Sequence, residues 1–307
     1  MVTVISNLLE RKKKMSKGTC FIALNNKELD YISFSVHAAN QIKKHFKKNN
    51  ATALITDYDG RGYLESIYSI EEINAVFDEV VIDKTKYNDT DNTRIHFDTP
   101  WSEFVAPFKN RQKHDVFWMS PFDKTLLLDI DYIVQSNHLE YLFKDDNPHS
   151  IQMFDNARYL RYKQAPFPER YLHPNGVPMW WSTVIYFDKS PESKMFFDLW
   201  SHIADNYDYY KFLYGFTGKL FRTDFCVSIA LHILNGMQHG DFVEPIAGSL
   251  INVDQKDFIA QSKTAENYHF LAYNRDEPWK NILVHIKDQD LHIMNKRSLM
   301  EAIEKYE

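Results

Sequence analysis

Cysteine is almost absent from this chain: Cys20 and Cys226 are the only two cysteines among 307 residues. Two cysteines cannot form a disulfide framework, and without histidines at matching spacing they are too few for a structural zinc site. The scarcity of cysteine fits a reducing compartment, so we expect a cytoplasmic protein.

Long apolar runs are also absent. No run reaches the roughly 18 residues that a membrane-spanning helix needs, so the sequence predicts no membrane anchor. The N-terminal region has no long apolar segment followed by a small-residue cleavage site, so we expect no secretion signal. No pattern in the sequence indicates an oligomeric state.

An excess of basic residues is missing too, since the formal net charge is -6 at pH 7. Residues 11–14, Arg-Lys-Lys-Lys, directly precede Met15, and purine-rich codons before a Met are typical of a translated ribosome-binding site. We therefore expect Met15 to be the natural start and residues 1–14 to be leader sequence, and we place residues 1–17 outside the folded domain, as a leader that is disordered or not native. The remaining body is more acidic still, which is not typical of a general nucleic-acid binder.

The first half of the chain alternates between segments with strand and helix patterns. Strands are predicted at 19–24, 52–56 and 79–82, and helices at 31–46 and 70–77. Such alternation indicates an α/β fold with a mostly parallel central sheet flanked by helices. Between these elements, Asp-Tyr-Asp-Gly at 57–60 predicts a turn, the polar stretch 83–98 a loop, and 101–108 a helix.

The second half is less regular and carries five prolines between 144 and 178. It predicts a strand at 180–187, a helix that starts at Ser190-Pro191-Glu192, a second helix at 225–234, and a final strand and helix at 282–286 and 298–306. We expect residues 18–307 to form one domain with a helical elaboration in this half.

The most informative segment is 125–134, in which an apolar run enters and leaves the pair Asp129 and Asp131. In a strand, alternate side chains share a face, so both carboxylates are expected to point the same way at the end of a buried strand. Two adjacent carboxylates repel unless a cation lies between them, and such oxygen ligands suit Mg²⁺ or Mn²⁺, which also bind substrate phosphates. The alternative is a strand that ends in two solvated acids.

Residues 122–134 resemble the Asp-x-Asp segment of GT-A-fold glycosyltransferases, especially the glycogenin-like and lipopolysaccharide-galactosyltransferase-like families. The order of the preceding elements is similar as well. The resemblance implies a single GT-A-like domain, with a nucleotide-binding half at 18–135 and an acceptor half at 136–307. It also implies an enzyme that moves a hexose or pentose from a nucleotide diphosphate sugar to a hydroxyl acceptor, with Mn²⁺ or Mg²⁺ as cofactor.

The resemblance assigns roles to particular residues. Asp129 would meet the donor ribose and the metal, Asp131 would bind the metal directly, and His292 or His285 would complete the metal site. His292 is favoured because its flanking residues are polar. The residues expected at the donor site are Ala23, Leu24, Asn25 and Asp57 near the nucleobase, Lys109 and Arg111 near the phosphates, and Trp181.

Asp224 is the candidate for the catalytic carboxylate, as general base of an inverting reaction or as a sugar-orienting group of a retaining one. Its place at a predicted helix start also suits a plain N-cap. The chain departs from the family at two points: Trp180 and Trp181 replace small residues, and the C-terminal His-x-x-Gly-x-x-Lys-Pro-Trp motif is not matched.

The second half also resembles glycosyltransferases of large tailed phages, some of which put sugars on hydroxymethylated DNA bases. The acceptor hydroxyl is therefore expected on a carbohydrate or on a modified DNA base, and a phage origin would make the compartment the host cytoplasm. Two other functions remain open. One is a phosphatase of the haloacid-dehalogenase type, whose Asp-x-Asp also ends a strand. The other is a non-catalytic protein that binds nucleotide sugars.

Overall fold

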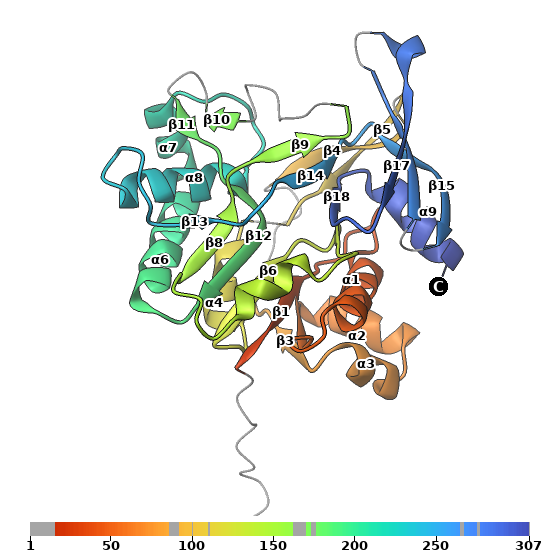
Figure 1. The fold of residues 1–307 in the computed structure, drawn as a ribbon, viewed down its shortest axis with the longest axis horizontal. Helices are drawn as coiled ribbons and strands as arrows, with labels where there is room; N and C mark the ends of the chain where they lie inside the picture. The colour runs from red at the N-terminus through yellow and green to blue at the C-terminus, as the bar shows by residue number, and fades with distance from the viewer. Residues whose placement is uncertain are drawn as a thin grey trace, which may run out of the picture.

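The computed structural model describes residues 16–85, 92–99, 101–109, 111–161, 170–172, 176–264, 267–274 and 277–306. Within this part of the chain, the largest sheet has seven strands, in the order β13 (Glu244–Pro245), β8 (Ile151–Phe154), β12 (Trp181–Asp188), β6 (Lys124–Leu128), β1 (Lys17–Ile22), β2 (Thr52–Thr56) and β3 (Glu79–Ile82). Strands β6, β1, β2 and β3 are parallel, whereas β12 is antiparallel to both of its neighbours. The predicted α/β class with a mostly parallel central sheet is confirmed (Figure 1).

The central strands are apolar without alternation because both faces of the sheet are covered. Leu126, Leu127 and Leu128 of β6 are all buried, and so is every residue of β2. Side chains of consecutive strand residues point to opposite faces, so continuous burial requires packing on both sides. The apolar run that leads to Asp129 is therefore the middle of the core.

Two groups of helices pack against the main sheet, one at β1 and β2 and the other at β12. The described helices are α1 (Tyr31–His45), α2 (Tyr58–Ile67), α3 (Ile70–Val76), α4 (Val116–Met119), α6 (Pro191–Asp205), α7 (Tyr207–Tyr214), α8 (Thr223–Leu234) and α9 (Lys296–Tyr306), with 3₁₀ turns η1 (Lys113–Asp115), η2 (His138–Phe143) and η4 (Pro278–Lys280). Helix α1 contacts β1 and β2, while α8 contacts β12 and α6, and Figure 1 shows these groups at opposite ends of the sheet. None of the helices in the described part of the chain combines the length and apolar character that crossing a bilayer requires.

A second sheet positions the candidate site. It has the order β7 (Tyr132–Ile133), β18 (Leu291–Ile293), β14 (Leu250–Val253) and β9 (Ala157–Tyr159). Because β7 follows β6 after only three residues, this sheet starts where the central strand of the main sheet ends. The four strands of this second sheet come from four separate parts of the sequence, and their pairing gathers those parts beyond the end of β6.

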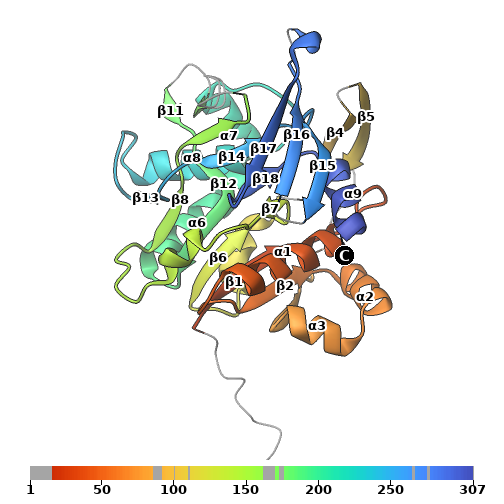
Figure 2. The ribbon, with the colours of Figure 1, turned by 45° about the vertical axis from the view of Figure 1, so that its right-hand side comes forward.

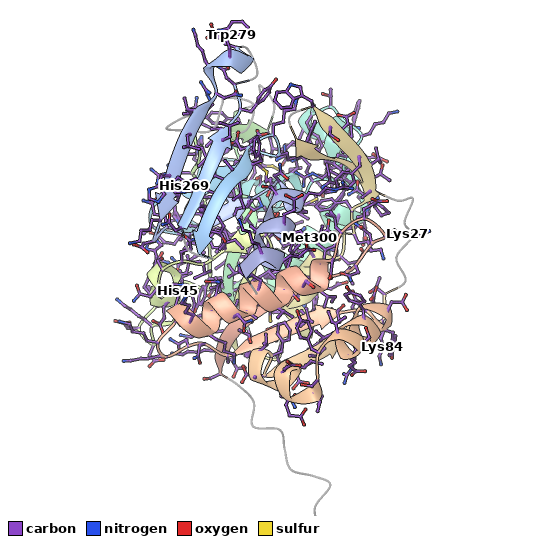
Figure 3. All side chains as sticks on the ribbon, turned by 90° about the vertical axis from the view of Figure 1, so that its right-hand side faces the viewer. Lys27, His45, Lys84, His269, Trp279 and Met300 are labelled. Carbon is purple, nitrogen blue, oxygen red and sulfur yellow. The ribbon has the colours of Figure 1, made fainter. Side chains whose placement is uncertain are left out.

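Antiparallel strands form the outer wall of the molecule. One hairpin consists of β4 (Thr93–Thr99) and β5 (Ser102–Pro107), and a three-stranded sheet consists of β15 (Phe258–Thr264), β16 (Asn267–Ala272) and β17 (Ile282–Lys287). Helix α9 contacts β4 and β15 (Figure 2). Strands β16 and β17 extend away from the body with Trp279 at the tip (Figure 3). Strands β10 (Tyr171–Leu172) and β11 (Val177–Pro178) form a separate small pair.

Several predicted elements need correction. Residues 57–60 are not a free turn, because Asp57 caps α2 by accepting a hydrogen bond from the Gly60 N–H at 2.7 Å. Residues 101–108 form strand β5 instead of a helix, and the predicted loop at 83–98 contains β4, with 86–91 outside the described residues. The predicted leader lies outside the described residues up to residue 15, and Lys17 is already the first residue of β1.

Most other elements agree with the sequence predictions. The strands predicted at 52–56 and 79–82 have the same bounds in the structure. Helix α6 starts as predicted, with the Ser190 side chain accepting from the Ser193 N–H and Pro191 in the first turn. These local signals are reliable because they satisfy backbone donors that no helical carbonyl can reach.

Gly18 in β1 leads to a test of core packing. A β-carbon added at Gly18 would lie 2.4 Å from ring atoms of the fully buried Phe122. We expect Gly18→Ala to destabilise the fold by about 1–3 kcal/mol because the ring has no free space into which to move. Gly62 in α2 is the matched control: nothing lies near its added β-carbon, so Gly62→Ala should stabilise the protein by about 0.5–1 kcal/mol. Urea unfolding of both variants measures the difference, and a Gly18→Ala protein as stable as wild type would contradict the packing.

Candidate functional site

Asp129 and Asp131 lie in the turn that connects β6 to β7. The Asp129 N–H donates to the Thr183 carbonyl of β12 at 3.0 Å, and the Tyr132 N–H donates back to the Asp129 carbonyl at 2.9 Å. The expectation that strand alternation aligns the two carboxylates was wrong, because β6 ends at Leu128. The tight turn brings the carboxylates together instead, at the carboxyl ends of the parallel strands.

Strand pairing brings His292 to this turn. Strand β18 is antiparallel to β7 with His292 opposite Tyr132, and the Ile293 N–H donates to the Asp131 carbonyl at 2.8 Å. One ligand atom each of Asp129, Asp131 and His292 lies within 4.8 Å of the others. The other histidine considered from the sequence, His285, lies on β17 with its ring stacked on His269 at 4.4 Å, and it is not part of this group.

Asn252 orients the His292 ring. The two residues are directly opposite each other in the parallel pair β14–β18, and Asn252 Oδ1 lies 2.9 Å from His292 Nδ1. When a metal occupies Nε2, Nδ1 carries the ring hydrogen and can donate it to this amide oxygen. Partners of this kind commonly fix the tautomer of a metal-binding histidine. The Nε2 atom lies 3.5 Å from Asp131 Oδ2, on the side of the carboxylates.

Asp131 is buried, and Lys296 and His292 beside it favour its charged form. The Lys296 ammonium, at the start of α9, donates to Asp131 Oδ2. Burial alone would raise the pKa of Asp131, but Lys296 and His292 hold it well below the usual range. The carboxylate is therefore ionised at neutral pH, as a metal ligand must be.

Lys113 forms the corresponding ion pair with Asp129. Its ammonium donates to Asp129 Oδ1 at 2.5 Å and to the Ser182 carbonyl at 2.7 Å. Lys113 comes from η1 and is buried, whereas the Asp129 side chain is about a third exposed (32%). Each carboxylate of the pair thus has one ammonium partner and retains a second oxygen.

Asp224 belongs to the same network. Its Oδ1 accepts from the Ser182 N–H at 2.9 Å and from the Ser182 hydroxyl at 2.8 Å, while Arg222 Nη2 lies 3.3 Å from Oδ2. Burial would raise the pKa of Asp224, but Arg222, Ser182 and Lys113 together hold it below its usual value. The N-cap interpretation of Asp224 was wrong: Arg222 is the N-cap residue of α8, and the Asp224 side chain bonds to β12.

One cavity of about 770 Å³ is lined by Asp129, Asp131, His292, Lys113, Lys296, Ser182, Arg222 and Asp224, whereas Asn252 does not reach it. Its floor is the turn after β6, one wall comes from β12 and the start of α8, and another comes from the β4–β5 hairpin. The volume lies within the range of small-molecule sites, roughly 300–1,000 Å³.

The predicted donor residues divide into two groups. Leu24, Lys109 and Trp181 line the cavity, whereas Ala23, Asn25, Asp57 and Arg111 do not. Asn25 and Asp57 bond to backbone N–H groups at the starts of α1 and α2, and Arg111 stacks over the Phe221 ring at 4.9 Å. The contacts of Asn25 and Asp57 thus hold those two side chains at the helix starts.

Sequence reasoning missed several residues of the site. The cavity is also lined by Lys113, Lys296, Arg94, Tyr31 and Asp83. Asn252 contacts the ring of His292 without lining the cavity itself. Lys296 had a weak signal, four residues after His292 in a polar segment. Asn252 had none, because its partner is 40 residues away and only strand register joins them.

The donor set suits a divalent cation. Asp129, Asp131 and His292 would hold it, because two carboxylates and an imidazole match the ligands of Mg²⁺ or Mn²⁺. Lys113 and Lys296 place additional positive charge beside that position. The arrangement can therefore bind a doubly charged anionic group such as a diphosphate.

The burial of Asp131 predicts a strong dependence on Lys296. Asp131→Asn should destabilise the protein by about 3–5 kcal/mol at pH 7, because it leaves the Lys296 ammonium buried without its partner. Lys296→Met in that background should restore much of the loss. Because the folded pKa of Asp131 is lowered, its contribution is complete above the unfolded pKa of about 3.9 and is lost as pH falls toward the folded value. Urea unfolding at pH 7 and pH 3.5 tests both points, and equal effects of Asp131→Asn at the two pH values would contradict them.

No protein-family model matches this chain, and no curated protein matches it. Among solved structures, it is similar to the glycosyltransferase GlyE of Streptococcus pneumoniae TIGR4 (12% identity, TM-score 0.42), with 76% of this chain and 45% of GlyE covered. It is also similar to the galactosyltransferase LgtC in complex with donor and acceptor sugar analogues (12% identity, TM-score 0.43, 70% of each chain). A third is mouse xyloside xylosyltransferase 1 (13% identity, TM-score 0.42, 75% of this chain and 85% of that one). The chain thus spans less than half the length of GlyE, and at such TM-scores we draw no functional conclusion from the likeness alone.

Proposed function

We propose that this protein is a metal-dependent glycosyltransferase of the GT-A type, which moves a sugar from a nucleotide diphosphate sugar to a hydroxyl group. The observation that carries the proposal is the convergence of Asp129, Asp131 and His292 in a cavity of about 770 Å³ at the carboxyl end of a parallel sheet. Ligands of open α/β sheets bind at that edge.

The donor diphosphate would lie between the metal ligands and the two lysines. Lys296 and Lys113 already donate to the carboxylates and can turn toward phosphate oxygens when a cation takes over the carboxylates. A bound Mg²⁺ or Mn²⁺ would supply Lewis-acid stabilisation of the negative charge on the departing diphosphate. The nucleoside would extend toward Leu24, Tyr31 and Asp83, which line the cavity at the ends of β1 and β3 and at the start of α1.

Asp224 would orient the sugar. In the reaction, the bond between the anomeric carbon and the diphosphate oxygen breaks, a bond to the acceptor oxygen forms, and the proton of the acceptor hydroxyl passes to the departing diphosphate or to solvent. A general base works best with a pKa near the working pH, whereas three donors hold the pKa of Asp224 below its usual value. Asp224 is therefore better suited to accept a hydrogen bond from a sugar hydroxyl, and Trp181 would pack against the sugar from the same strand as Ser182.

The acceptor in this proposal is a hydroxyl of a carbohydrate or of a modified DNA base. A phosphatase of the haloacid-dehalogenase type is less well supported, because three parallel strands of the main sheet precede β6 in the chain and such enzymes carry the nucleophile on the first strand. A non-catalytic nucleotide-sugar-binding protein would share the same cavity and differs only in turnover.

Binding of nucleotide and metal tests the proposal. A thermal-shift screen of nucleoside diphosphates with and without Mn²⁺ should give a metal-dependent rise in midpoint with one nucleotide class. A ligand at 100 times its dissociation constant stabilises a protein by roughly 2.7 kcal/mol, which moves the midpoint measurably. Asp129→Asn should remove the metal-dependent part, because Asp129 is one of three ligands and, being partly exposed, is the least needed for folding.

Asp145→Asn is the matched control, since Asp145 is an exposed carboxylate that also pairs with a lysine, Lys17, outside the cavity. It should leave the shift unchanged. Release of nucleoside diphosphate from the corresponding donor then separates an enzyme from a binding protein. The absence of a shift with every nucleotide, together with hydrolysis of p-nitrophenyl phosphate, would replace the proposal with the phosphatase.

A further inference from the structure

Arg94 is a cation of the cavity that has no acidic partner. It lies on β4 and lines the cavity, and among the described residues no carboxylate lies within ion-pair distance of it. The other cations beside the carboxylates are paired: Lys113 with Asp129, Lys296 with Asp131 and Arg222 with Asp224. Asp129, Asp131 and Asp224 thus each have a cationic partner, and the positive charge of Arg94 remains able to bind an anionic ligand.

The surroundings hold the Arg94 guanidinium in place without neutralising it. Its carbon lies 5.2 Å from the centre of the Phe108 ring. With the Gln255 amide turned so that its oxygen faces Arg94, that oxygen accepts from Nε at 3.3 Å and from Nη2 at 2.5 Å, and the amide nitrogen donates to the Ile95 carbonyl at 3.1 Å. A neutral amide and an aromatic face orient a guanidinium, and its other N–H groups stay available for a planar oxyanion.

The charge of Arg94 carries a cost that these contacts do not offset. Burial lowers the pKa of Arg94 and the nearby Arg222 lowers it further, whereas Asp131, Tyr31 and Asp224 raise it from beyond ion-pair distance, and the net pKa stays below its usual value. An unpaired charge in such a place destabilises the free protein, whereas a bound anion would remove that cost.

We propose that Arg94 binds a carboxylate or phosphate that the substrate carries in addition to the donor diphosphate. The inference rests on the proposed function, in which the metal ligands, Lys113 and Lys296 already serve the diphosphate. Arg94 belongs instead to the β4–β5 hairpin, where Ile95 and Val105 line the cavity mouth with half-exposed apolar side chains. The anionic group would belong to the donor sugar, as in a uronic acid, or to the acceptor, as in a sugar phosphate.

Matched ligands distinguish these two sources. Calorimetry with Mn²⁺ would compare three donors on the nucleobase that the screen selects: the nucleoside diphosphate, its glucose ester and its glucuronate ester. In the presence of the nucleoside diphosphate, glucose and glucose 6-phosphate would be compared as acceptors. We expect wild type to bind the anionic member of one pair about tenfold to a hundredfold more tightly than the neutral member, the range of one charged hydrogen-bonded contact.

Arg94→Met should abolish that preference, bringing the two members within about twofold of each other, while affinity for the nucleoside diphosphate stays the same. Arg94→Lys should keep part of the preference, because it retains the charge and loses the fork geometry. Arg158→Met is the matched control, since Arg158 also donates to a glutamine, Gln289 at 3.3 Å, but lies outside the cavity. It should leave every affinity unchanged.

Thermal stability separates ligand binding from a structural role. An arginine retained for a ligand costs stability in the free protein, so Arg94→Met should melt at the wild-type temperature or above it. A lower midpoint, or equal binding of neutral and anionic ligands by wild type, would overturn the inference. A loss of nucleoside diphosphate affinity in Arg94→Met would assign Arg94 to the diphosphate and overturn it as well. Failure of all nucleotides to bind wild type would instead refute the proposed function.

Discussion

The burial of Asp131 is the constraint on which the site depends. A carboxylate in this position is tolerated only when cationic or hydrogen-bonding groups surround it, and here they come from the far end of the chain. His292 lies on β18 and Lys296 is the first residue of α9, so the last two elements must dock before the turn after β6 is stable. The charge of one side chain thus fixes the position of a strand and a helix that lie about 160 residues later in the sequence.

A second network extends the site across the main sheet. Lys113 joins Asp129 to the Ser182 carbonyl, and the N–H and hydroxyl of Ser182 bond to Asp224. The groups proposed to bind the metal and the group proposed to orient the sugar are therefore held by consecutive hydrogen bonds through β12. Such support holds the carboxylates in fixed positions, which the electrostatic stabilisation of a leaving group would require.

The sequence predicted those parts of the fold and site that depend on local patterns. The apolar run before Asp129, the parallel strands at 52–56 and 79–82 and the Ser190 cap all follow from neighbouring residues. The β5 strand was mistaken for a helix because it is stabilised by pairing with β4 and by the contact of Phe104 with Arg297 of α9, and neither partner is visible in a short window. The same limit explains Asn252, Lys113 and Arg94: each reaches the site through strand register or a long side chain, and no spacing rule connects them with the Asp-x-Asp segment.

Helix α9 links the two halves of the cavity. Lys296 compensates Asp131 at the floor, while the next residue, Arg297, places its guanidinium 4.1 Å from the centre of the Phe104 ring on the β4–β5 hairpin and 3.6 Å from Glu28. The hairpin that carries Arg94 is thus held against the same helix turn whose Lys296 pairs with Asp131. A cation that replaces Lys296 at Asp131 would change the contacts at the start of α9 and, through Arg297, the seating of that hairpin. The proposed metal binding at the floor and the proposed anion recognition at the wall therefore share one structural element, through which binding at one position would affect the other.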